Sequence, residues 1–133
     1  MTDSFADGQQ SFNRCLTRRD FLRRFYAVFS QRDDRIRDRF RDTDWDMQVQ
    51  LLRHGISASL LYATGGDLGG SEIKRLSKSH AKKGLDIPAW MYDDWMEALM
   101  QTVRETDEAY TEALEARWRK AMDPAISRMR KGR

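Results

Sequence analysis

Apolar residues recur along the chain at the spacing of amphipathic helices. Residues 21–29 form a wide stripe in which aromatic and aliphatic side chains return every three or four positions (Phe21, Leu22, Phe25, Tyr26, Phe29). Residues 45–60 carry a second stripe, which Met47 and Leu51 widen. No stretch alternates apolar and polar residues between hairpin turns, so the pattern favours helices throughout.

Capping signals, glycine and proline mark the expected helix boundaries. Thr17 and Thr43 each stand three residues before an aspartate, which is the spacing of a capping box. Gly65 ends the long second stripe, and Pro88 begins a later helix because proline is tolerated in a first turn. Pro124 is expected to kink or interrupt the last helix.

A glycine-rich segment at residues 64–71 separates the two halves of the chain. Ser71 is positioned to cap the next helix, which carries Ile73, Leu76 and His80 on one face. Including this helix, the sequence predicts an all-α fold of about seven helices packed around a single core.

Length and composition fit one domain spanning residues 1–133. The 133 residues include 40% hydrophobic and 11% aromatic residues, which is enough for a core. We expect residues 1–10 to be a loose segment and residues 130–133 to be a basic tail. A single cysteine, no signal-peptide pattern and no long apolar run predict a soluble cytoplasmic protein without a membrane partner.

Charge gives little support for nucleic-acid binding. The formal net charge is +3, from 24 basic and 21 acidic residues, but the two signs are interspersed. Only residues 128–133 form a basic run without acids. We therefore expect a solvated charged surface and no nucleic-acid partner.

Histidine is the scarce chemical group in this chain, which has only His54 and His80. With one cysteine, there are too few soft ligands for a tetrahedral zinc site, and no nucleophile triad or phosphate-binding loop is present. His54 falls off the predicted apolar face and is expected at the surface. His80 is either an ordinary structural histidine or an axial haem ligand, since an apolar helix face precedes it and a Gly-Leu-x-x-Pro corner follows it.

Three stretches resemble the globin family in their order and spacing. Residues 25–48 resemble the second and third helices and the following corner of bacterial globins, and residues 80–95 resemble the proximal histidine region. Trp118 and the residues after it resemble the terminal helix. The resemblance covers residues 10–130, points to single-domain bacterial globins and to the globin domains of haem-based gas sensors, and implies a three-over-three helical fold.

The resemblance implies a haem b site with one iron ligand and seven lining residues. His80 would be the proximal ligand, and the lining residues would be Tyr26, Phe40, Gln48, Leu52, Leu76, Ile87 and Tyr92. Tyr26 and Gln48 would be the distal polar residues, although either Phe25 or Tyr26 faces the pocket. Gln48 is either part of the distal site or part of the helix surface.

The function that the resemblance implies is reversible binding of a diatomic gas, namely oxygen and possibly NO or CO. The biological role would be oxygen binding, sensing, or protection against NO and oxidative stress. Weak NO dioxygenase or peroxidase activity is compatible with such a site, but enzymatic turnover is not expected as its selected function. The expected partners are a second copy of the chain in a homodimer, a separate reductase or a separate signalling protein. The alternative hypothesis is a haem-free globin-fold module for protein interaction or signalling.

Overall fold

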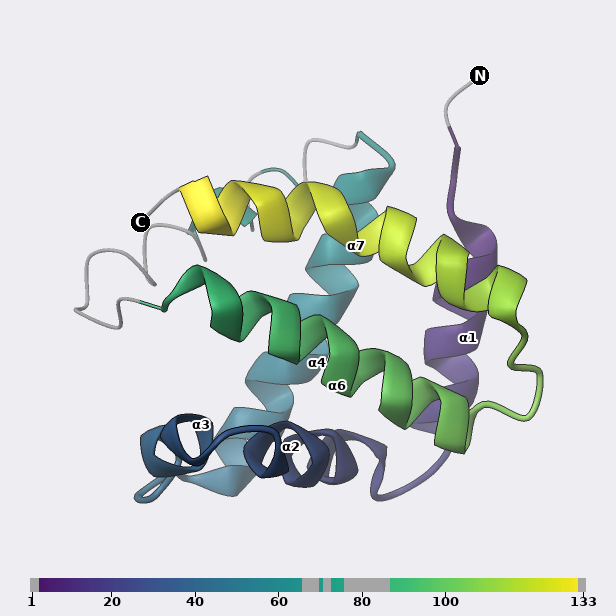
Figure 1. Ribbon diagram of the computed structural model, residues 1–133. Coiled ribbons are helices and arrows are strands. Elements are labelled where there is room, and N and C mark those ends of the chain that lie inside the picture. The colour runs from purple at the N-terminus through teal and green to yellow at the C-terminus, as the bar shows by residue number, and fades with distance from the viewer. Residues whose placement is uncertain (1–2, 66–69, 71–72, 76–86, 132–133) are drawn as a thin grey trace.

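Figure 1 shows the computed structural model, which describes residues 3–65, 70, 73–75 and 87–131. Within these ranges the chain forms six α-helices, which are 6 to 20 residues long, and no strand. This confirms the all-α prediction. The helices are α1 (Ala6–Leu16), α2 (Phe21–Gln31), α3 (Asp34–Arg39), α4 (Trp45–Ala63), α6 (Ala89–Thr106) and α7 (Glu112–Lys131). Residues 73–75 are also helical, where a further helix was predicted.

The helices cross one another around a shared core. Helices α6 and α7 run antiparallel, and α4 passes behind both at a steep angle (Figure 1). Helix α2 packs on α6, while α1 packs on the first part of α7. Each helix contributes at least one fully buried side chain to this core, namely Phe12, Phe25, Ile36, Ile56, Leu99 and Trp118.

Aspartates cap both α3 and α4, although a threonine was predicted to begin α4. The Asp33 carboxylate accepts a hydrogen bond from the Arg35 backbone N–H at 2.8 Å, and Asp44 accepts one from Met47 N–H at 3.2 Å. The prediction that Thr43 begins the long helix is therefore wrong by one residue. Thr17 belongs to the end of α1, where its hydroxyl donates to the Arg14 carbonyl.

Helix α4 buries a narrower face than the sequence predicts. Leu52, Ile56 and Leu60 point into the core, as their spacing indicates. Met47 and Leu51 were expected to widen this stripe, but their side chains are 61% and 53% exposed. Met47 and Leu51 each lie one position before the row of residues 48, 52, 56 and 60 that faces the core. One residue step along a helix rotates the side chain, so both of them face solvent.

Helix α7 continues through Pro124, so the interruption that was one of the two predicted outcomes does not occur. Proline removes one helical N–H and crowds the preceding turn. Pro124 itself lies on the exposed side, while Met122 and Ile126 on either side of it are buried in the core. Packing of these neighbours holds the helix together across the lost hydrogen bond.

Both ends of the described chain are more ordered than predicted. The loose segment expected at residues 1–10 is contradicted from residue 3 onward, because Phe5 is buried and α1 begins at Ala6. Asp3 and Asp7 both form ion pairs with Arg117 of α7 at 2.7 Å. Of the basic tail expected at residues 130–133, the first two residues belong to α7, which extends to Lys131, and the last two lie outside the described residues.

A buried polar network fixes α1 against the other end of the chain. The Asp107 carboxylate, which is fully buried, accepts hydrogen bonds from Arg14 Nε at 2.7 Å and from Ser11 Oγ at 2.6 Å. The Ser11 hydroxyl in turn accepts one from the Trp118 indole N–H at 2.9 Å. Burial on its own would raise the pKa of Asp107, but these hydrogen bonds outweigh it and lower the pKa below its usual value.

None of the helices in the described part of the chain is long and apolar enough to cross a membrane.

Candidate functional site

Two polar side chains meet where α2 crosses the first turn of α4. The Gln48 side-chain N–H donates a hydrogen bond to the Tyr26 hydroxyl at 2.9 Å, although the two residues are 22 positions apart. Tyr26 is only 5% exposed. The structure therefore brings together the two residues that were predicted to form the distal polar pair.

Phe25 and Tyr26 are adjacent in sequence but have different surroundings. Phe25 is fully buried and its ring contacts those of Phe29 and Trp95, each at 5.5 Å between centroids. Only Tyr26 reaches across to Gln48. Of the two candidates that the sequence left open, Tyr26 is the one that joins the polar pair.

The environment of Tyr26 keeps its hydroxyl protonated. Burial raises the pKa of Tyr26 to about 12, and the hydrogen bond from Gln48 offsets only part of this rise. The hydroxyl oxygen already accepts a hydrogen bond from Gln48, whereas among the described residues its own hydrogen faces the backbone carbonyl of Gln48, at 3.5 Å between the oxygens. That contact is too long to be a strong hydrogen bond, so the Tyr26 hydroxyl can donate a hydrogen bond to a bound ligand instead.

Apolar side chains surround this pair. The Phe40 ring lies 5.3 Å from that of Tyr26, and Leu52 follows Gln48 by one helical turn and is buried. Tyr26, Phe40, Gln48 and Leu52 thus occupy one region between α2, α3 and α4.

The proximal residues are placed only in part. Ile87, just before α6, is half-buried, and Tyr92 within α6 is buried. Both belong to the same hydrophobic core as Tyr26. Leu76 and His80 lie outside the described residues, so the predicted iron ligand and one lining residue stay predictions.

The other histidine, His54, is exposed on α4, as expected from its position off the apolar face. Within the described ranges, no three His, Cys, Asp or Glu side chains are grouped so that they could hold a metal ion.

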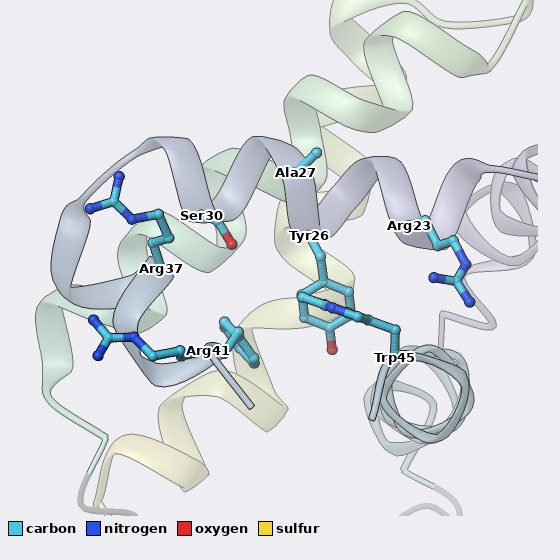
Figure 2. Close-up of a pocket in the computed structure, with 8 residues that line it drawn as sticks. Arg23, Tyr26, Ala27, Ser30, Arg37, Arg41 and Trp45 are labelled. Atoms are coloured by element: carbon cyan, nitrogen blue, oxygen red, sulfur yellow. The ribbon is translucent and has the colours of Figure 1, made fainter. Parts of the chain in front are cut away.

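A cavity of about 410 Å³ beside Tyr26 was not anticipated from the sequence (Figure 2). Arginines at positions 23, 37 and 41 line it, together with aromatic side chains. Nothing in the sequence marked these arginines, because each stands among other charged residues of both signs.

The arrangement of the crossing helices is that of a globin, and comparison with known structures agrees. A crystal structure of protein PA3967 from Pseudomonas aeruginosa PAO1, described as structurally highly homologous to a human hemoglobin, matches with a TM-score of 0.91. The two proteins share 32% sequence identity over 98% of each chain. This chain therefore belongs to the globin family. No protein-family model and no curated protein matches the sequence.

Proposed function

We propose that this globin binds haem b and reversibly binds a diatomic gas, with oxygen as the favoured ligand. The observation that carries the proposal is the partly buried hydrogen bond from Gln48 to Tyr26, which leaves the Tyr26 hydroxyl able to donate to a ligand near the apolar side chains of Phe40 and Leu52. We infer a cytoplasmic role in oxygen binding, in sensing, or in protection against NO and oxidative stress. A second copy of the chain, a reductase or a signalling protein would be the partner.

The described residues fit one wall of a haem pocket. Phe40, Leu52, Ile87 and Tyr92 offer apolar or aromatic surface that would line the group, and Tyr26 supplies the polar contact. His80 would provide the iron ligand, as the family resemblance implies. Bound haem would supply an iron that can take a gas molecule as a ligand.

Tyr26 acts in this proposal as a hydrogen-bond donor to the gas. Its pKa of about 12 keeps the phenol neutral, so the proton is present at physiological pH. Gln48 is a positioning residue, because its N–H occupies an acceptor site of the Tyr26 oxygen and orients the hydroxyl. A ligand that takes on negative charge, such as oxygen, gains more from this donor than one that stays nearly neutral, such as CO.

Absorption spectroscopy tests haem binding directly. The purified protein is expected to show a Soret band that shifts on reduction and shifts again under CO. His80→Ala should lose this band, whereas the matched control His54→Ala should keep it because His54 is exposed on α4. A featureless spectrum that added hemin leaves unchanged would refute the proposal and favour the haem-free interaction module.

Gas dissociation rates test the role of Tyr26. Tyr26→Phe removes the donor and is expected to speed oxygen dissociation by about tenfold, which corresponds to ~1.4 kcal/mol for one lost hydrogen bond. CO dissociation should change much less. Tyr62→Phe on α4 is the control, since among the described residues the Tyr62 hydroxyl makes a weak 3.5 Å contact with Arg128 at the surface. Equal effects of Tyr26→Phe on both gases would contradict hydrogen bonding as the cause.

A further inference from the structure

The cavity beside Tyr26 is a second candidate binding site. It lies between α2, α3 and the start of α4 and has a volume of about 410 Å³, at the small end of the range for sites that take small molecules. Ala27 and Ser30 of α2 line its wall, one helical turn apart. Its opening is bordered by charged side chains, so it is reached from solvent (Figure 2).

Three aromatic rings form the inner surface of the cavity. Tyr26 lies 5.3 Å from both Phe40 and Trp45, and Phe40 lies 5.9 Å from Trp45, measured between ring centroids. Each ring packs against the other two, so the surface is fixed in shape. Such a surface favours a flat apolar body, which can stack or make edge contacts with the rings.

Arginines surround this aromatic surface on two sides. Arg37 and Arg41 stand on one side of the Tyr26 and Trp45 rings, and Arg23 stands on the other (Figure 2). The guanidinium group is well suited to bind a carboxylate, because its N–H donors match the two oxygens in geometry. An apolar body with one anionic group would therefore satisfy both parts of the cavity.

The aspartates that now pair with these arginines are exposed, so a bound ligand can take their place. Each arginine forms an ion pair with an aspartate whose side chain is at least half exposed (Asp46, 92%; Asp34, 84%; Asp38, 54%). Exposed ion pairs contribute little to stability, so exchanging one for a ligand carboxylate costs little. A guanidinium also has five N–H donors, which leaves room for a second acceptor.

We propose that this cavity binds a small aromatic carboxylate, with its ring against Tyr26, Phe40 and Trp45 and its carboxylate held by Arg23 at one side of these rings. The site shares Tyr26 and Phe40 with the proposed haem pocket, but its arginines are not among the residues expected to contact haem or gas. Arginine variants test carboxylate binding and the Soret band tests haem binding, so either proposal can fail without the other.

Isothermal titration with naphthalene-2-carboxylate tests the site, with the neutral naphthalene-2-carboxamide as the companion ligand. Arg23→Gln is expected to weaken carboxylate binding by about five- to tenfold, and Arg41→Gln on the opposite side of the rings by much less. Arg24→Gln is the matched control. It lies next to Arg23 on α2, has a similar exposure of 46% against 54%, and also pairs with a carboxylate, but it does not line the cavity.

The proposal predicts saturable binding that Arg24→Gln leaves within about twofold of the unmodified protein and that the carboxamide does not reproduce. Equal losses in Arg23→Gln and Arg24→Gln would mean attraction by overall charge alone and would overturn it. Equal affinity for the carboxamide, or no saturable binding, would overturn it as well. Circular dichroism of each variant confirms that the helices are intact before titration.

Discussion

Replacing the buried aspartate Asp107 by asparagine tests how the first helix is held. The substitution keeps the shape of the side chain but removes its charge. Asp107 is the common acceptor for Arg14 and Ser11, and its carboxylate also accepts the Ala109 backbone N–H at 2.9 Å. The variant therefore weakens several contacts between α1 and the α6–α7 connection at once.

The expected loss in free energy of unfolding depends on how exposed the side chains of Asp107 and Arg14 are. Isolating a buried charge by removing its partner costs about 3–5 kcal/mol. Here the arginine left behind, Arg14, is 42% exposed, so water can solvate part of its guanidinium. We therefore expect Asp107→Asn to lower the free energy of unfolding by about 2 kcal/mol, close to the value of hydrogen bonds to charged groups.

Urea unfolding followed by circular dichroism measures this loss, which should lower the transition midpoint by about 1 M. Glu108→Gln is the control, because the adjacent Glu108 also pairs with an arginine but is 84% exposed. Its loss is expected to stay below about 0.5 kcal/mol. If the two variants lost equal stability, the buried network would not be what anchors α1.

The difference in stability between the unmodified protein and Asp107→Asn also depends on pH, and the direction of this dependence follows from the pKa of Asp107. Because the pKa of Asp107 is lower in the folded protein, its contribution is fully present above the unfolded pKa of about 3.9 and is lost as the pH falls through the folded pKa. The stability gap between the unmodified protein and Asp107→Asn should thus be constant near neutral pH and narrow below about pH 4. A gap that stayed constant into strong acid would contradict the assignment.

Four other positions give predictions that unfolding curves or thiol labelling can check. Gly55→Ala should stabilise α4 by about 0.5–1 kcal/mol, since a Cβ there meets no atom within 4 Å, whereas Gly65→Ala should destabilise because Gly65 has a φ of +81°. Pro124→Ala should stabilise α7 by about 1–3 kcal/mol by restoring a helical N–H; a loss of stability would show that proline is favoured there. Cys15, buried and with its pKa raised to about 12 mainly by burial, should resist Ellman's reagent until urea unfolds the chain.

Much of the fold was predictable because burial follows the helical repeat. The stripe at residues 21–29 became α2, and Leu52, Ile56 and Leu60 became the buried face of α4. Boundaries were less accurate, as Thr43 and Asp44 show, because either side chain can cap and only the local backbone decides between them. Whether α7 continues through Pro124 depends on tertiary packing, which helix propensity does not describe.

The polar residues, too, could be predicted from the sequence only in part. Tyr26 and Gln48 were chosen from family resemblance and lie within hydrogen-bond distance. Asp107 was overlooked, because an acid in a polar stretch carries no sign that Arg14 and Ser11, more than 90 positions away, will enclose it. The arginines of the cavity escaped notice for a related reason, since only the crossing of α2, α3 and α4 gathers them.

The ties between α1 and α7 have a consequence for how the protein is made. A ribosome releases α1 first, but its partners Arg117 and Trp118 are added about 100 residues later. At a synthesis rate of roughly 5–20 residues per second, Phe12 waits for several seconds before Trp118 can cover it. The nascent chain thus carries an unsatisfied apolar helix through most of its synthesis, a period in which it is a natural substrate for chaperones that hold exposed apolar segments.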